Sequence, residues 1–579
     1  MTPIWKLISL SAEQEQSVRQ LEKDFDPLLS RLLAERNVCT FEEARQFFRP
    51  ALAQLHDPYL MKDMDRAVER LNRALQQKEK ILVYGDYDVD GTTAVAMVFG
   101  FLSSFTPSIG YYIPDRNSEG YGISTQSIEY AHREGYTLII ALDCGIKAVD
   151  KIALANSYGI DFIICDHHTA DNILPDAVAV LDPKRNDCHY PYEYLSGCGV
   201  GFKLLQAFSL SNEIPFANLE KYIDLVAVSI ASDIVPITGE NRVLAFCGLA
   251  KLNSNPSFGL KHIIEVCNLS DKEIDISDVV FKIGPRINAS GRMRTGNEVV
   301  ELLITNNVQT AREKCSDIDA YNNERRDLDK RTTDEAKTII PSADQLTDTR
   351  TLVVYNQNWN KGIVGIVASR LAEEFHKPTI VLAGIPDSDM LCGSARSVPG
   401  FDLYNAIDTC RSLLVNFGGH MYAAGLSLPI KNLETFKQQF EASVRATILP
   451  EQLSPQVEID AEITLKDITP KFVRILKQFN PFGPCNMKPV FQTRRVFDRG
   501  GSRLVGKEQK HLKLEMVDDT KAVFSGIAFA SALMRNYDMA TILSHLKQNK
   551  AIDICYTVEE NIFNGKVSTQ LMICDIRMV

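Results

Sequence analysis

Short apolar runs separated by more polar stretches dominate the chain from about residue 81 to residue 240. Runs of this length with few polar positions are typical of buried parallel strands, and the stretches between them are long enough for helices. The predicted strands lie at 81–84, 111–114, 137–143, 161–168 and 177–183. Another apolar segment, 225–233, could be helix or strand, because periodicity cannot decide for so short a run. The alternation predicts an α/β domain with a parallel sheet.

The same kind of pattern divides the rest of the chain. Leucines at helical spacing dominate the first 75 residues, and alternating charge predicts a long helix beginning near residue 297. A second strand–helix unit follows, and after Leu449-Pro450 the chain changes to short alternating runs with turn signals. The predicted regions are 1–75 (helical), 76–296 (parallel-sheet α/β), 297–347 (connector helix), 348–449 (smaller α/β) and 450–579 (β-rich).

Acidic side chains and histidines stand where several of these apolar runs end. Active sites of open α/β sheets lie beyond the carboxyl ends of the strands, so these side chains are expected to share one edge of the sheet. Crowded carboxylates raise one another's pKa values unless a cation neutralises them, and Mg²⁺ or Mn²⁺ suits oxygen ligands of this kind. The residues concerned are Asp86, Asp88, Asp90, Asp143, Asp166, His167, His168 and Asp233.

A simpler interpretation stays open for part of this set. An exposed acidic turn would explain the aspartates of 86–90, and Asp143 and Asp166 could cap the helices that follow them. Capping does not account for the two histidines that come directly after Asp166. The repetition of acidic run ends within one domain favours a shared metal site.

Composition and charge limit the class of protein. The 579 residues are too many for one core, and 45% hydrophobic with 24% charged residues is ordinary for a globular protein. No apolar run reaches the roughly 18 residues of a membrane span, and the N-terminus lacks a signal-peptide pattern. The 13 cysteines include no CxxC pair, which favours reduced cysteines in a cytoplasmic protein. The net charge of −11 still permits a local basic groove for nucleic acid.

An ordered series of motifs from residue 81 onward resembles the DHH phosphoesterase superfamily, and within it the RecJ family of single-strand-specific exonucleases. The series begins with the aspartates of 86–90, Asp143, the Asp-His-His sequence at 166–168, and Asp233. Further motifs follow in family order at 114–122, 284–292, 393–397, 418–425 and 481–484. A lone Asp-His-His sequence would be weak evidence, whereas the ordered set is specific. The resemblance implies a DHH catalytic domain, a long helix, a smaller α/β DHHA1 domain and a β-barrel OB-like domain.

The resemblance also implies a role for each acidic residue and histidine. Asp86 is a further ligand or a partner of the ligands, Asp166 orients its neighbours, and His168 contacts the scissile phosphate. A pair of ions about 3.5–4 Å apart could activate a water molecule and stabilise the leaving oxygen of a displacement at phosphorus. Two divalent ions, Mn²⁺ or Mg²⁺, are assigned to Asp88, Asp90, Asp143, His167 and Asp233.

Basic side chains supply candidate contacts to DNA. Arg116, Arg286 and Arg396 are candidates for phosphate recognition, and His420 could donate a hydrogen bond to a phosphate. The family resemblance implies that the phosphate is the 5′ phosphate of the strand. A basic patch in the last region, with aromatic residues interleaved, suits single-stranded DNA held by phosphate contacts and base stacking. The solvated face of a small β-domain is the alternative interpretation. The patch contains Arg494, Arg495, Arg499, Arg503, Lys507, Lys510 and Lys513.

Three functions remain open at this stage. The resemblance implies a 5′→3′ exonuclease that hydrolyses single-stranded DNA to 5′-mononucleotides in DNA repair and recombination. A DHH phosphodiesterase for short oligonucleotides or cyclic dinucleotides would not need the long C-terminal region. A non-catalytic DNA-binding scaffold would have lost the acidic ligands, all of which are present. The family likeness further implies a helicase and a single-strand-binding protein as partners, and we expect a monomer.

Overall fold

The computed structural model describes residues 3–116, 118–340, 346, 348–530, 537–563 and 566–579. The chain forms two compact units. The first unit contains Phe41–Glu324 and Phe479–Met487, and the second contains Met1–Thr40, Arg325–Gln478 and Lys488–Val579. No helix in this described part of the chain combines the length and the apolar character needed to cross a bilayer.

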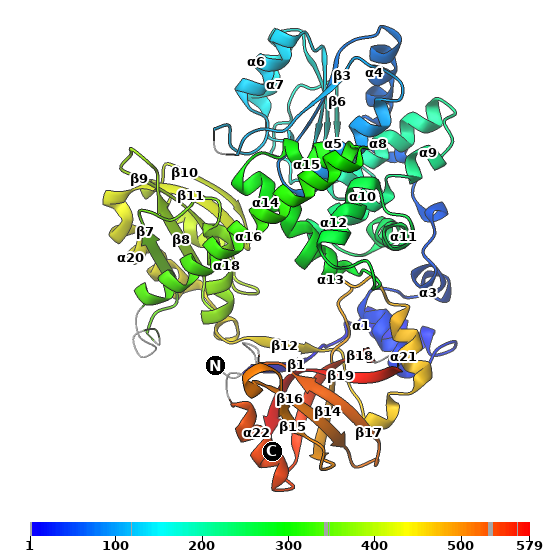
Figure 1. The fold of residues 1–579 in the computed structure, drawn as a ribbon, viewed down its shortest axis with the longest axis vertical. Helices are drawn as coiled ribbons and strands as arrows, with labels where there is room; N and C mark the ends of the chain where they lie inside the picture. The colour runs from blue at the N-terminus through cyan, green and yellow to red at the C-terminus, as the bar shows by residue number, and fades with distance from the viewer. Residues whose placement is uncertain (1–2, 117, 341–345, 347, 531–536, 564–565) are drawn as a thin grey trace. The chain divides into compact units, whose positions relative to one another are not determined.

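A five-stranded parallel sheet organises the first unit (Figure 1), and it confirms the predicted parallel-sheet α/β fold. The strand order is β3-β2-β4-β5-β6, and every neighbouring pair is parallel. All carboxyl ends therefore lie at one edge, as the acidic run ends require. The strands are β2 (Ile81–Gly85), β3 (Ile109–Tyr112), β4 (Leu138–Leu142), β5 (Asp161–Cys165) and β6 (Ala179–Leu181).

Helices cover both faces of this sheet, which explains why the strands β2 and β4 are buried at every position. Ile140 of β4 packs in one core, and its neighbour Ile139 packs in the core on the opposite face. Helices of the first core include α4 (Met64–Gln76), α5 (Val89–Leu102), α8 (Gly197–Ser211) and α10 (Ile223–Ser232). Helices of the other core are α6 (Thr125–Glu134) and α7 (Val149–Ser157). The remaining helices of this unit include α3 (Phe41–Phe48), α9 (Ala217–Glu220), α11 (Gly239–Ser254), α12 (Phe258–Val266), α13 (Ile276–Asp278) and α14 (Gly284–Met293).

The structure decides the conformation of two segments that the sequence pattern left open or predicted differently. The undecided run 225–233 is helical, as α10, and all its residues from Ile223 to Ala231 are buried, so no polar face marks its period. The predicted connector from residue 297 is two helices, α15 (Asn297–Ile304) and α16 (Val308–Ile339). The chain leaves the helical conformation between them, and Asn307 starts the second helix: its side chain accepts a hydrogen bond of 3.0 Å from the amide of Thr310 and caps that helix.

The second unit contains a smaller mixed sheet, in line with the predicted second α/β region. Its order is β10-β11-β9-β8-β7, with only β7 and β8 parallel. The strands are β7 (Leu352–Asn356), β8 (Thr379–Gly384), β9 (Met390–Arg396), β10 (Asn416–His420) and β11 (Ala423–Pro429). The helices are α18 (Val364–Phe375), α19 (Leu403–Asp408) and α20 (Leu433–Thr447).

A seven-stranded sheet follows in the C-terminal region, with the order β13-β14-β18-β19-β17-β16-β15. β14 pairs with β16 as well as with β18, so the pairings run from β14 through β18, β19, β17 and β16 back to β14. The strands are β13 (Ala461–Glu462), β14 (Phe491–Asp498), β15 (Arg503–Val505), β16 (His511–Val517), β17 (Val523–Ala528), β18 (Ile552–Phe563) and β19 (Lys566–Met578). The helices are α21 (Pro470–Lys477) and α22 (Met539–Lys547).

The N-terminal region is not purely helical as predicted. Strand β1 (Ile4–Leu7) pairs in parallel with β12 (Gln456–Ile459), more than 400 positions later in the chain. Helices α1 (Ala12–Leu21) and α2 (Pro27–Glu35) follow β1. Arg31 of α2 donates a hydrogen bond of 2.6 Å to the carbonyl of Asp460, so the first forty residues are part of the second unit.

Glu35, next to Arg31 in this region, gives the stability of the second unit a testable pH dependence. Burial raises the pKa of Glu35 to about 8, with a further contribution from the Asp460 carboxylate, although Arg31 lies 2.9 Å away. The neutral form therefore stabilises the fold below the unfolded pKa, and that stability is lost as the pH rises toward about 8. We expect Glu35→Gln to remove this loss, which is at most about 1.4 kcal/mol per pH unit.

Tryptophan fluorescence in urea, measured between pH 5 and pH 9, would test the Glu35 prediction, because both tryptophans, Trp5 and Trp359, belong to the second unit. The exposed Glu22→Gln serves as the matched control and should follow the wild-type curve. A Glu35→Gln protein that loses stability in parallel with the wild type would show that this carboxyl group is not responsible.

Candidate active site

The loop after β2 turns tightly into α5 and carries the first three aspartates. Asp88 is the N-cap of α5, and its carboxylate accepts a hydrogen bond of 3.0 Å from the amide of Gly91. Gly91 packs directly on the backbone of Asp86, since a Cβ at position 91 would lie 2.4 Å from the Asp86 carbonyl oxygen. Only glycine permits this close approach, which fixes the loop against the first turn of the helix.

Asp90 is held by a second helix and by a serine that the sequence analysis did not single out. Its two carboxylate oxygens each accept a hydrogen bond of 2.7 Å, one from the amide of Gly197 and one from Cys198, in the first turn of α8. Ser229 of α10 donates a third bond of 2.6 Å. A helix N-terminus favours a negative charge, so these donors stabilise the buried carboxylate and set its orientation.

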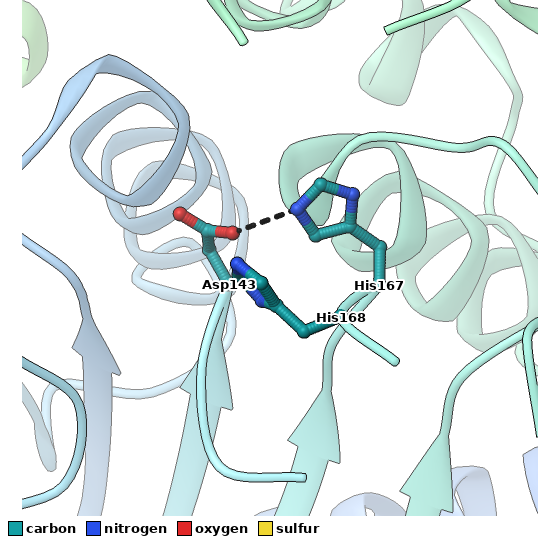
Figure 2. Close-up of side chains that lie close together, drawn as sticks. All are labelled: Asp143, His167 and His168. Carbon is teal, nitrogen blue, oxygen red and sulfur yellow. Dashed lines mark ion pairs between the residues drawn. The ribbon is translucent and has the colours of Figure 1, made fainter. Parts of the chain in front are cut away.

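Asp143 follows β4 in a left-handed backbone conformation, with φ of 59°. Aspartate tolerates this conformation better than most residues. Gly197 of α8 packs on it, because a Cβ at position 197 would lie 2.6 Å from the Asp143 Cβ. Figure 2 shows the Asp143 carboxylate facing the ring of His167, with an Oδ1–Nε2 distance of 3.2 Å.

His167 joins the remaining acidic groups. Its Nε2 atom lies 3.8 Å from the nearer Asp90 oxygen and 3.6 Å from Asp233 Oδ2. Asp233 comes from the end of helix α10, not from a strand, so the cluster gathers strand ends and a helix end. Ligand atoms lie within 4.8 Å of one another in three overlapping groups: Asp86 with Asp88 and Asp143; Asp90 with His167 and Asp233; Asp143 with His167 and His168.

Burial of so many carboxylates in one place shifts their proton affinities. Burial raises the pKa values of Asp86, Asp143 and Asp233 well above the usual range, and neighbouring carboxylates raise them further. Burial also lowers the pKa of His167, which favours the neutral imidazole that binds metals. A bound cation would reverse the acidic shifts, because it stabilises the charged carboxylates.

Unsatisfied polar atoms test whether a cation fits this site. Among the residues that the structure describes, neither the two Asp86 carboxylate oxygens nor the two His167 ring nitrogens have a hydrogen-bond partner, and all four atoms are buried. Orphaned polar atoms of this kind are costly without a ligand. Carboxylate oxygens with one imidazole match the ligand preferences of Mn²⁺ and Mg²⁺, so the residues present fit divalent cations.

Asp166 holds the Asp-His-His sequence in shape. It accepts hydrogen bonds from the amides of Ile146, His167 and His168 and from the His168 ring, where Nδ1 lies 2.7 Å from Oδ1. Burial alone would raise the pKa of Asp166, but the His168 hydrogen bond and the other donors outweigh burial and lower it. Burial likewise lowers the pKa of His168, and Asp166 more than reverses this effect.

Tyr121 is a member of the site that the sequence analysis missed as an individual residue. Its hydroxyl group lies 3.1 Å from His168 Nε2 and 3.5 Å from the Asp143 carbonyl oxygen. The His168 ring is therefore held on both nitrogens, by Asp166 and by Tyr121. Its only sequence signal was its position inside the 114–122 motif.

Two of the candidate phosphate-binding arginines lie in the first unit. The Arg116 guanidinium lies over the ring of Tyr87, 5.2 Å from its centroid, and its charge offsets a part of the rise that burial causes in the pKa of Asp86. Arg286 is already engaged, because it donates to Asp319 at 2.8 Å and to the carbonyl of Lys282 at 3.0 Å. A phosphate would therefore have to share Arg286 with Asp319.

Arg396 and His420 lie on the strands to either side of β11 in the second unit. Both occupy one row of the sheet, since Ala423 pairs with Arg396 on one side and with His420 on the other. The Arg396 guanidinium also approaches the first turn of α18, where a Cβ at Gly365 would lie 3.0 Å from Nη2. An arginine beside the N-terminus of a 12-residue helix is a suitable arrangement for a phosphate.

The basic patch of the C-terminal region is less positive than its sequence indicates. Arg494 pairs with Glu462 at 2.9 Å and Arg495 with Asp519 at 3.3 Å, whereas Arg503 donates to the carbonyl of Gly501 at 3.3 Å. Exposed ion pairs are worth only about 0–1 kcal/mol, so a phosphate could displace these carboxylates. The sequence analysis missed an aromatic pair in this region, half-buried His511 of β16 and exposed Phe529 just after β17, with ring centroids 4.9 Å apart.

Comparisons with known proteins extend these observations to the whole chain. Family models match at residues 80–230 (DHH family, N-terminal domain), 348–446 (DHHA1 domain) and 459–575 (RecJ OB domain). The single-stranded-DNA-specific exonuclease RecJ of Bacillus subtilis is 34% identical over 550 residues, covering 95% of this chain and 68% of that protein. The protein of the same name from Salmonella typhimurium is 33% identical over 587 residues, covering 98% of each.

A solved structure has the same fold. The crystal structure of RecJ from Thermus thermophilus in complex with Mn²⁺ matches all of this chain and 80% of that chain, with a TM-score of 0.82 and 24% identity. The metal-site geometry, the three family models and the 33% identity that extends over 98% of the chain all indicate the same family. The chain therefore belongs to the RecJ family.

Proposed function

We propose that this chain is a metal-dependent exonuclease that hydrolyses single-stranded DNA. The observation that carries the proposal is the set of buried ligand atoms of Asp86 and His167 that make no hydrogen bond within the carboxylate cluster. A cation would satisfy those atoms, and the cluster lies where an α/β sheet presents its active site. The names of the relatives, single-stranded-DNA-specific exonucleases, support the substrate.

The ligands we assign to two divalent ions come from four segments of the first unit. When bound, Mn²⁺ or Mg²⁺ ions would activate a water nucleophile and neutralise charge that develops on the phosphate. Asp86 serves as a further ligand or as a partner of the ligands. The hydrogen bonds from α8 and Ser229 to Asp90 preorganise the site, because they hold that carboxylate before substrate arrives. The assigned ligands are Asp88, Asp90, Asp143, His167 and Asp233.

His168 is the group we assign to the scissile phosphate. Its side chain is 44% exposed, so a substrate can reach it, whereas Asp166 beneath it is only 1% exposed. Asp166 holds Nδ1 and raises the His168 pKa, which favours the charged ring. If the phosphate displaces the Tyr121 hydroxyl group from Nε2, the charged imidazole would donate a strong hydrogen bond to a phosphate oxygen, orient the reacting group and stabilise its charge.

The direction and products of cleavage are part of the proposal. Arg116 and Arg286 of the first unit, and separately Arg396 and His420 of the second unit, are the candidate phosphate contacts. Recognition of a 5′ phosphate would make cleavage proceed 5′→3′ and release 5′-mononucleotides. Arginine binds phosphate through two parallel hydrogen bonds, which suits recognition of a chain end. Arg494, Arg495 and Arg503 of the OB domain would bind the strand through its backbone. The family motifs support this assignment.

The cellular setting follows from the same family membership. We infer a role in DNA repair and recombination in the cytoplasm, with a helicase that supplies single strands and a single-strand-binding protein as partners. A monomer with domain boundaries near residues 76, 297, 348 and 450 is part of this inference. Gel filtration of the purified chain with light scattering would check the oligomeric state.

A digestion time course would test the function. The substrates are a single-stranded oligonucleotide labelled at the 5′ or 3′ end, the matching blunt duplex, and a dinucleotide, each with Mn²⁺ and with EDTA. We expect release of mononucleotides from the 5′ end of the single strand, little attack on the duplex, and no reaction in EDTA.

Other outcomes of the time course would favour the alternatives. Fast hydrolysis of the dinucleotide alone would make the chain a small-substrate phosphodiesterase, for which the OB domain has no use. Binding of the strand without cleavage under any divalent ion would indicate a scaffold. Release from the 3′ end would contradict the proposed 5′-phosphate pocket.

A further inference from the structure

Phe281 has the most exposed large apolar side chain in the described part of the chain, at 76%. Single exposed apolar residues are common and need no function. Phe281 differs in its backbone, because it lies at the centre of a π-helical turn, Val279–Ile283. The amide of Gly284 donates to the carbonyl of Val279, five residues earlier, as in a π-helix. Such turns are rare and frequent at functional sites.

Helical spacing directs the ring of Phe281 outward. Val279 and Ile283, four residues apart, are both fully buried, and Phe281 lies midway between them. Residues four apart share one face of a helix, so the residue between them lies on the opposite side, which here faces solvent. The exposed ring adds nothing to the apolar burial that stabilises the fold.

The turn and the helix after it contact the segments that carry candidate metal ligands of the first unit. Gly284 packs on Ser232, where a Cβ at position 284 would lie 2.8 Å from the serine Oγ, and the next residue is Asp233. Farther along α14, the Asn288 side chain accepts a hydrogen bond of 3.2 Å from the amide of Val89, beside Asp88. Asn288 comes seven positions after Phe281, which is about 10 Å along a helix axis.

The surroundings of Phe281 fit a nucleobase better than a protein partner. Polar residues close to it in the sequence, such as Asp275 and Ser277, are exposed, and Phe281 is a single apolar side chain among them. Lys272 and Lys282 lie 2.7 Å and 3.0 Å from opposite oxygens of Asp278, so ion pairs hold polar groups beside the turn. One flat apolar face among polar side chains suits a base of a single strand.

We propose that Phe281 stacks on a base of the single strand whose end is cleaved at the metal centre, and is thus a substrate-positioning residue. The inference rests on the proposed function and deepens it. The separation of about 10 Å from Asn288 exceeds the 3.4 Å rise per stacked nucleotide, so the base concerned lies beyond the terminal nucleotide. A dinucleotide would not reach the ring. Because every base has a flat face, the contact does not select sequence.

Stacking can be measured without catalysis. The full chain in EDTA would be titrated with 12-residue oligonucleotides that carry 2-aminopurine at successive positions, whose fluorescence an aromatic stack quenches. We expect quenching at one internal position, lost in Phe281→Ala with a Kd about 5- to 150-fold weaker, from the cost of losing one stacked base. Phe281→Trp should restore quenching and affinity, whereas Phe281→Leu should not.

Activity supplies the second arm of the test, with Mn²⁺ present. Phe281→Ala should lower kcat/KM on the 12-residue strand and leave hydrolysis of a dinucleotide unchanged. The matched control is Phe246→Ala, since Phe246 is a 40% exposed phenylalanine on α11 of the same unit, and it should behave as wild type. Thermal melting of each variant would verify that the fold is intact.

The outcomes separate this inference from the proposed function. Quenching that persists in Phe281→Ala, equal binding by Phe281→Leu and wild type, or equal loss on the dinucleotide and the 12-residue strand would each overturn the stacking role. Any of these would leave the exonuclease intact if wild type degrades the strand. Failure of wild type to cleave any strand would overturn the proposed function instead, while the fluorescence arm would still decide whether Phe281 stacks.

Discussion

Replacing Asp143 with asparagine will abolish cleavage of single-stranded DNA while making the metal-free protein more stable. Asparagine suits the left-handed backbone at this position, where φ is 59°, so the loop is retained. Loss of an outer partner of a metal ligand costs roughly 10–100-fold, and loss of the ligand itself should cost more. Digestion rates and calorimetric titration with Mn²⁺ would measure both effects.

The stability gain follows from the sign of the pKa shift. Burial and the neighbouring carboxylates raise the pKa of Asp143 in the folded state well above its usual value. Its ionisation therefore opposes folding once the pH exceeds the unfolded value of about 3.9, and the asparagine variant escapes this cost. We expect a higher Tm for metal-free Asp143→Asn at pH 7 and no difference near pH 3.

The exposed Asp65→Asn on α4 provides the matched control for this substitution. It makes the same chemical change outside the cluster, so activity, Mn²⁺ affinity and Tm should stay near the wild-type values. An Asp143→Asn protein that keeps activity, or that loses Mn²⁺ binding without any gain in metal-free Tm, would contradict the picture of a repulsive cluster neutralised by cations.

Replacing Gly91 with alanine is expected to lower activity by about 10²-fold or more, although no ligand is removed. A Cβ at this position would lie 2.4 Å from the carbonyl oxygen and 2.6 Å from the amide nitrogen of Asp86, so backbone must move. Displacement of catalytic groups by about 1 Å can cost 10²-fold, and overpacking costs about 1–3 kcal/mol of stability. Digestion rates and urea unfolding would measure the two effects.

Gly100→Ala on the same helix is the control for Gly91→Ala. A Cβ at position 100 would meet the Tyr222 side chain at 3.1 Å, which can shift, and alanine gains about 1 kcal/mol of helix propensity over glycine. We expect near wild-type activity from this control. Equal activity of Gly91→Ala and wild type would mean that the loop tolerates displacement and that its fit to α5 does not hold the ligands in position.

Much of the fold could be predicted because the burial pattern is local. A strand buried on both faces is apolar at every position, as in β2 and β4, and is recognisable without knowing its neighbours. Helix α10 is equally buried on all sides, so its sequence carries no period and only the structure identifies it as a helix. Strand β1 could not be predicted, because its partner β12 lies more than 400 residues away.

The candidate site divides in the same way. Acidic run ends and the Asp-His-His sequence indicated which residues would meet, since the carboxyl ends of parallel strands share one edge. Tyr121 and Ser229 had no such signal, because a tyrosine or serine is common anywhere in a chain. For the basic patch, the sequence predicted more positive charge than the structure shows. The sequence lists the basic residues but does not reveal which carboxylates pair with them, such as Glu462 beside Arg494.

The sequence by itself determined the class of fold, the family and the chemical type of the site, because residue type, period and motif order are properties of the linear chain. Only the tertiary structure decided the distances among Asp143, His167 and Asp233, and the unpartnered state of Asp86. It also decided the exposure of Phe281. Distances and exposure depend on which elements pack together, and packing joins residues that no local pattern relates.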